Sequence, residues 1–124
     1  MSIEDDYYHQ RLQNLIDGLA ARTRAAIEAD HDLWEQPEPD VYELNLTKTS
    51  MRIFSRDRDG QKPYYFELYD AHGSLVDTIE DSGWGQPVNL ENLYTLVSQG
   101  EKQKAREAAL QEALNELDIS EPPF

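Results

Sequence analysis

The chain contains no cysteine and only three histidines among its 124 residues. The absence of cysteine excludes disulfides, zinc–thiolate sites and thiol catalysis. No apolar run approaches the roughly 20 residues of a membrane-spanning helix, and the acidic start lacks the basic and apolar regions of a signal peptide. These absences predict a single cytoplasmic domain, residues 1–124, that is held together by packing alone.

Basic residues are also scarce, with 11 Lys and Arg against 25 Asp and Glu, and the net charge is -14. Such a charge repels phosphate backbones and anionic lipid, so we expect neither direct nucleic-acid binding nor membrane binding. The central segment, residues 41–69, departs from this pattern because it holds four acids and five bases. An acidic, solvated surface surrounding a nearly neutral centre is therefore predicted.

The first segment, residues 4–30, has apolar residues at spacings of three and four, which predicts an amphipathic helix. Its predicted buried stripe consists of Tyr8, Leu12, Leu15, Ile16, Leu19, Ala20, Thr23, Ala26 and Ile27. Gly18 lies inside this helix, where glycine costs about 1 kcal/mol relative to alanine. We interpret Gly18 as a point of close packing against another element.

The stretch W-E-Q-P-E-P-D, residues 34–40, breaks a helix because proline lacks an N–H, and we interpret it as a connector. The apolar period then changes from about 3.6 to two. Four strands are predicted at residues 41–46, 51–56, 63–69 and 74–79, separated by the turn sequences T-K-T-S, D-R-D-G and D-A-H-G. Short strands with tight turns predict an antiparallel meander.

A second helix is predicted after the sequence G-W-G, with Asn89 as its N-cap and Val88 and Leu93 as a hydrophobic staple. Gly100 is expected to end or bend this helix. Its first part carries the apolar residues Leu90, Leu93, Tyr94 and Val97, and the part after Gly100 carries Ala109, Leu110, Ala113, Leu114 and Leu117. Residues 118–124 are predicted to be a frayed tail.

These elements predict an α+β fold: an N-terminal helix, a four-stranded antiparallel β-meander and one or two C-terminal helices. A single layer of helices on one sheet face is the usual way for this pattern to bury one core. The core residues predicted from the strands are Leu44, Leu46, Ile53, Tyr64, Phe66, Leu68, Val76 and Ile79.

No residue cluster predicts catalysis, a metal site or a cofactor site. His31 lies between Asp30 and Asp32, a context that could form half of an acid–base pair, but solvated residues at a helix end have the same pattern. The segment S-R-D-R-D-G, residues 55–60, resembles part of a calcium loop, yet its twelfth position is Phe66 and its flanks are strands. We interpret this segment as a hairpin turn in which Gly60 supplies the positive φ.

The strand alternation instead predicts a surface that bears aromatic and arginine side chains. If Ile53, Phe66 and Leu68 point inward, then the neighbouring positions point to the opposite face of the sheet. That face would carry Arg52, Phe54, Arg56, Tyr65, Glu67 and Tyr69. Such residues are enriched at binding hot spots, although two structural interpretations remain: the C-terminal helices cover this face, or the side chains only stack across strands.

Trp84 has glycine on both sides and precedes the last helix. Two interpretations are open for it: an indole packed as a lid over the core, which we favour, or an exposed anchor for a partner. Trp34, beside the connector, presents the same choice.

The sequence thus favours a small non-enzymatic module of a regulatory, adaptor or immunity type. It would bind another protein, whose identity the sequence does not specify, through the aromatic and arginine face of the sheet or through an acidic helix face. The predicted protein-binding residues are Arg52, Phe54, Arg56, Tyr65, Tyr69 and Trp84. The alternative function is an acidic mimic of nucleic acid that inhibits a DNA- or RNA-binding protein, with carboxylates in place of phosphates. Self-association through helix pairing is a further hypothesis, because residues 105–117 carry a long apolar stripe.

Overall fold

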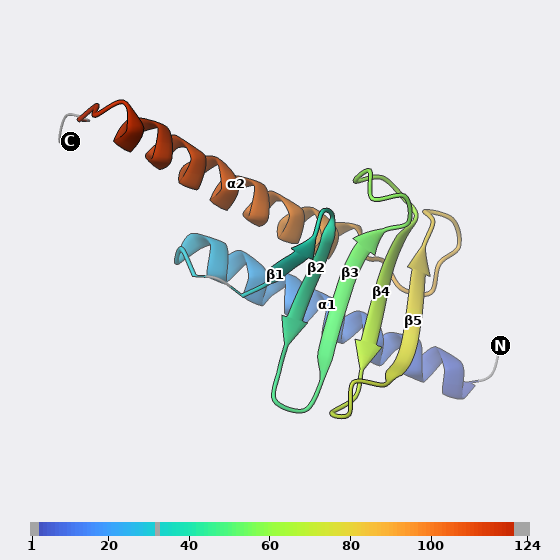
Figure 1. The fold of residues 1–124 in the computed structure, drawn as a ribbon. Helices are drawn as coiled ribbons and strands as arrows, with labels where there is room; N and C mark the ends of the chain where they lie inside the picture. The colour runs from blue at the N-terminus through green and yellow to red at the C-terminus, as the bar shows by residue number, and fades with distance from the viewer. Residues whose placement is uncertain (1–2, 32, 121–124) are drawn as a thin grey trace.

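The computed structural model describes residues 3–31 and 33–120 and has an α+β fold, as predicted. Its elements are, in chain order, α1 (Ile3–Glu28), β1 (Glu35–Glu38), β2 (Val41–Asn45), β3 (Ser50–Ser55), β4 (Tyr64–Tyr69), β5 (Leu75–Asp81) and α2 (Glu91–Glu116). The strands form one antiparallel sheet in the order β1-β2-β3-β4-β5. Both helices lie on the same side of this sheet (Figure 1).

The core lies between the helices and the sheet face that they cover, which we call the inner face. On that face, Phe66 of β4 pairs with Ile53 of β3 and with Ile79 of β5, in register across three strands. The helices contribute the apolar positions of their stripes to the same cluster, which contains Leu12, Ile16, Leu19, Ala20, Leu93, Tyr94 and Val97. The apolar residues that alternate along the strands and those that recur every three to four residues along the helices therefore form one hydrophobic core.

Five strands are present where four were predicted, because β1 lies inside the predicted connector. Pro37 falls within β1, a strand at the edge of the sheet, where a missing ladder donor is tolerated. Just before β1, the Trp34 ring is 3% exposed and its Nε1 donates a hydrogen bond to Thr23 Oγ1 at 2.9 Å. For Trp34 the core interpretation is therefore confirmed.

Several predicted core positions are exposed. Leu46, which follows the last residue of β2, and Val76, near the start of β5, are exposed. The other strand positions are buried as predicted, namely Leu44, Ile53, Tyr64, Phe66 and Ile79. Leu68 is partly buried against the core. In α1, Tyr8 and Leu15 are exposed, and Tyr8 instead donates a hydrogen bond to Asp77 Oδ2 at 2.7 Å.

Both glycine predictions for the helices were wrong. A Cβ built on Gly18 would meet no atom within 4 Å, so this residue is not a packing contact. Gly100 does not end α2, which continues to Glu116 and shows no sharp bend along its length (Figure 1). A Cβ at Gly100 would lie 3.1 Å from Ile27 Cδ1, the shortest such distance for any of the six glycines. Gly100 is therefore a position where α2 packs tightly against α1.

The start of α2 is held by a buried carboxylate from the end of β5. Leu90 occupies the N-cap position and makes no side-chain cap bond, whereas the predicted Asn89, one residue earlier, accepts a 2.9 Å hydrogen bond from the Glu91 N–H through its Oδ1. The Leu90 backbone N–H donates to Asp81 Oδ2 at 2.8 Å, and Gly83 N–H donates to Asp81 Oδ1 at 3.0 Å. The staple residues Val88 and Leu93 are both fully buried, as expected of a staple.

Beyond Gly100, α2 leaves the body of the protein and extends past the end of α1 (Figure 1). In this part the side chains are mostly exposed, including Leu110 at 57%. Of the predicted tail, residues 121–124 lie outside the described residues. Within the described chain, neither helix is long and apolar enough to cross a membrane.

Candidate protein-binding surface

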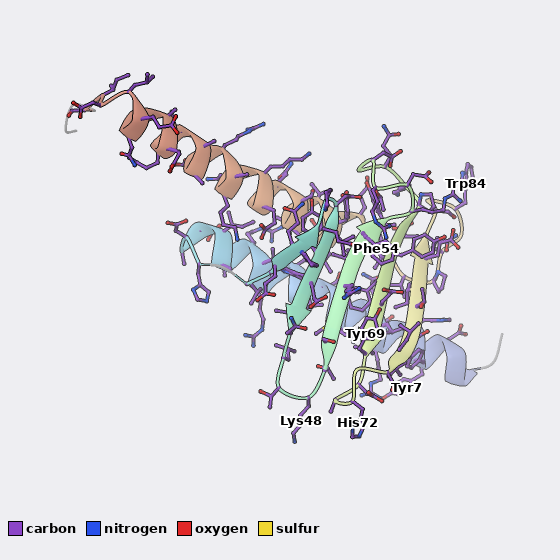
Figure 2. All side chains as sticks on the ribbon, in the orientation of Figure 1. Tyr7, Lys48, Phe54, Tyr69, His72 and Trp84 are labelled. Carbon is purple, nitrogen blue, oxygen red and sulfur yellow. The ribbon has the colours of Figure 1, made fainter. Side chains whose placement is uncertain are left out.

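The face of the sheet opposite the helices, which we call the outer face, carries the predicted aromatic and arginine residues. Strand pairing places Phe54 beside Tyr65 and Arg52 beside Glu67. Figure 2 shows Phe54 and Tyr69 on this side of the sheet, away from α1. Since α1 and α2 both pack on the inner face, the interpretation in which the C-terminal helices cover the outer face is wrong.

Phe54 and Tyr65 stack at one end of the outer face, with ring centroids 5.7 Å apart and an angle of 22° between their planes. The Arg58 guanidinium lies over the Phe54 ring, with Cζ 4.4 Å from the ring centroid. Nη1 of Arg58 also donates a hydrogen bond of 2.8 Å to the Ser55 carbonyl. The three side chains form a pre-arranged layer that combines π-faces with a positive charge.

Arg58 was not among the predicted residues, and its position depends on the turn between β3 and β4. Arg58 has a φ of 58°, a left-handed conformation that few non-glycine residues adopt. The base of the turn is fixed by Asp40, whose carboxylate accepts hydrogen bonds from the Ser55 hydroxyl, the Ser55 N–H and the Tyr94 hydroxyl. Gly60 closes the turn with the predicted positive φ, 81°.

A second, polar group lies further along the outer face. Arg52 Nε is 2.6 Å from Glu43 Oε2, and its Cζ lies 5.8 Å from the Tyr69 ring centroid. Hydrogen bonds from Asn45 and from Arg52 hold the pKa of Glu43 below its ordinary value, which keeps the carboxylate charged. Tyr69 donates to Glu67 Oε1 at 2.8 Å, and burial followed by this bond raises the pKa of Tyr69.

Two of the predicted binding residues lie outside these groups. Arg56 follows the last residue of β3, is exposed, and lies 3.8 Å from the Asp57 carboxylate. Trp84 is 86% exposed in the loop between β5 and α2, so the favoured lid interpretation was wrong (Figure 2). Tyr64 pairs with Asp81, so the loop of Trp84 leaves the sheet at the same end as the turn of Arg58.

A groove of about 390 Å³ lies on the other side of the molecule, between the end of α1 and the middle of α2. Its walls include His31, Trp34 and Glu107. His31 itself is exposed, and Asp32 lies outside the described residues. Among the described residues, no three His, Asp or Glu side chains come together in a way that would hold a metal ion.

No protein-family model, no curated protein and no solved structure matches this chain. We therefore infer function from the outer face itself.

Proposed function

We propose that the protein is a non-enzymatic interaction module of the cytoplasm that binds another protein through the outer face of its sheet. The observation that carries the proposal is the layer of Arg58, Phe54 and Tyr65, which lies on a face that neither α1 nor α2 covers. Tyrosine and arginine are enriched among the few hot-spot residues that supply most of the binding energy in protein interfaces.

The geometry lowers the cost of binding through this layer. Phe54 and Tyr65 are fixed by neighbouring strands, and Arg58 is held by its bonds to two backbone carbonyls, Ser55 and Arg56. Side chains that are already ordered lose less entropy on association, where each newly immobilised side chain costs about 0.5–1.5 kcal/mol. A partner gains contact with this layer without ordering it first.

The charges around the layer indicate the chemistry of the partner. Glu80 pairs with Tyr65 across the strands, and Glu43 and Glu67 flank Arg52. Since the whole chain carries a net charge of -14, we expect a partner surface with a planar or apolar centre and a basic rim. Trp84, at the same end of the sheet, extends the proposed contact.

The test is capture of partners from the lysate of the source organism at low and high salt. Wild-type protein is compared with the double variant Phe54→Ala/Tyr65→Ala and with Trp84→Ala. Tyr7→Ala is the matched control, because Tyr7 is an exposed aromatic residue on α1, the helix that packs on the inner face of the sheet. We expect a protein that is retained in high salt, is lost with the double variant and is kept by the control.

A different result would contradict the proposal. If every captured protein binds the double variant as well as wild type, the outer face is not the binding surface. If, in addition, those proteins bind nucleic acid and are released by salt, the acidic-mimic function is supported in its place.

A further inference from the structure

The groove between the end of α1 and the middle of α2 has the size and the apolar lining of a small-molecule site. Its buried and half-buried lining residues are mostly apolar and include Ile27, Trp34 and Val97. Its volume of about 390 Å³ lies in the range of roughly 300–1,000 Å³ that ligand pockets occupy. The groove can therefore hold the apolar body of a small ligand.

The charged residues around this groove are mainly acidic. Asp30, Glu101 and Glu107 contribute three carboxylates. Lys104 contributes the single ammonium group among the described residues of the lining. With His31 counted as neutral, acids outnumber bases by three to one, so the electric field of the groove favours a cation over an anion.

Glu101 is the least exposed of these three carboxylates. Its side chain is 12% exposed, whereas Asp30 and Glu107 are exposed residues. Within the described chain no N–H or O–H donates a hydrogen bond to Glu101, and its ion pair with Lys104 is long, with Nζ 3.4 Å from Oε1. Buried carboxylates normally accept hydrogen bonds, because burial without them is costly. A ligand that brings donors into the groove would therefore meet a carboxylate with unused acceptor capacity.

We propose that the groove binds a small organic cation, with a primary ammonium group at Glu101 and an apolar body against Ile27 and Trp34. An ammonium group carries three donors and no acceptor, which matches a carboxylate that lacks donors. The apolar lining supplies affinity for the body of the ligand, and the carboxylates select the charge of its head group. The proposal is independent of the outer face, because both helices that form the groove lie on the opposite side of the sheet (Figure 1).

The probe for this site is 4-phenylbutylamine, which joins a phenyl ring and a short apolar chain to an ammonium group. The measurement uses the Trp84→Phe protein, in which Trp34 is the only tryptophan and reports on the groove by its fluorescence. At pH 7 and fixed ionic strength, we expect a saturable change in emission with a dissociation constant on the order of 1 mM, which is usual for a ligand of this size. The isosteric 4-phenylbutyrate, with a carboxylate in place of the ammonium group, should bind at least tenfold more weakly.

Three variants in the same Trp84→Phe background test the role of the carboxylates. Glu101→Gln keeps the shape of the side chain and removes its charge, so it should weaken amine binding at least tenfold. The matched control is Glu112→Gln, which removes one carboxylate from an exposed position of α2 outside the groove lining and should bind as the parent protein does. Asp30→Asn changes the rim without disturbing a buried group, because Asp30 is exposed and its φ of 53° suits asparagine. It should weaken amine binding by about two- to threefold.

Helical circular dichroism checks that each variant folds, and the amide chemical shifts of Gly100 and Gln103 give a second readout that does not depend on fluorescence. Equal affinity for the amine and the carboxylate would overturn the assignment of a cation. Equal loss in Glu101→Gln and Glu112→Gln would assign the effect to the net charge of the chain and would also overturn it. Should Glu101→Gln fail to fold, unchanged amine binding by Asp30→Asn has the same consequence. If neither signal changes saturably at about ten times the expected dissociation constant, the groove does not bind such ligands.

Discussion

The Asp81 carboxylate and the Leu90 backbone N–H are joined by a 2.8 Å hydrogen bond, although nine residues separate them. The bond connects the last residue of β5 to the N-cap of α2, and both residues are buried. A helix start has N–H groups without partners in the helix, and here a strand residue supplies the acceptor.

We predict that Asp81→Ala lowers the free energy of unfolding by about 2–3 kcal/mol, because the Leu90 N–H is then buried without an acceptor. Urea denaturation measures this change. Asp57→Ala is the control, since Asp57 is exposed and its ion pair with Arg56 is a surface pair worth less than about 1 kcal/mol. If the two substitutions lowered the free energy of unfolding equally, the hydrogen bond from Leu90 to Asp81 would contribute no more to stability than a surface ion pair.

The two tryptophans are expected to differ in fluorescence and in their contribution to stability. Trp84→Phe should leave the blue-shifted, poorly quenched emission of buried Trp34, and Trp34→Phe should leave emission that acrylamide quenches readily. Replacement by alanine should cost about 3–5 kcal/mol at Trp34 and under about 0.5 kcal/mol at Trp84. A protected Trp84 signal would restore the lid interpretation.

Stability should decline in alkali through Tyr42. Burial, then the negative charges of Asp40 and Glu101, raise the pKa of Tyr42 from 10.0 to about 12. The folded protein thus holds the phenolic proton more tightly than the unfolded chain does. The contribution of Tyr42 is complete below pH 10 and is lost as the pH rises to about 12, a total on the order of 3 kcal/mol.

The variant Tyr42→Phe removes this ionisation, so its free energy of unfolding should fall less steeply between pH 10 and 12. Denaturant titrations at several pH values compare the two proteins. A decline of the same depth in both would assign the alkaline loss to other groups.

The outer-face variants should bind poorly while remaining stable. The stacked pair of Phe54 and Tyr65 contributes about 0.5–1.5 kcal/mol beyond area burial, and Arg58 over Phe54 adds about 0.5–1 kcal/mol at an exposed site. Arg58→Ala should therefore lower the free energy of unfolding by about 0.5–1 kcal/mol, and Phe54→Ala, which loses both contacts, by about 1–2.5 kcal/mol apart from area burial, in thermal or urea denaturation. A larger loss would indicate that the layer serves mainly to hold the sheet together.

Alternation in β3 and β4 made the facing of the sheet predictable. A strand has a period of two, so the burial of Ile53 and Phe66 places Phe54 and Tyr65 on the other face. The outer position of Arg52 follows from the same rule. β1 was missed because prolines argue against a strand, whereas an edge strand tolerates them.

Arg58, Trp34 and Trp84 depend on tertiary structure that local patterns do not contain. Arg58 reaches Phe54 because Arg58 itself adopts a left-handed backbone conformation, in a turn whose base is held by the hydrogen bonds to Asp40. The two tryptophans lie in similar glycine- or proline-containing segments. However, Trp34 is buried and hydrogen-bonded to Thr23 of α1, whereas Trp84 is exposed to solvent. The single-domain assignment and the binding function remain predictions.

The composition of β1 limits how other chains can approach this protein. All four of its residues are exposed, Pro37 and the following Pro39 have no N–H to donate, and Glu35 and Glu38 bring negative charge to the edge. A foreign strand that paired here would lose ladder hydrogen bonds and meet that charge, so this edge is a poor template for fibril growth or strand addition.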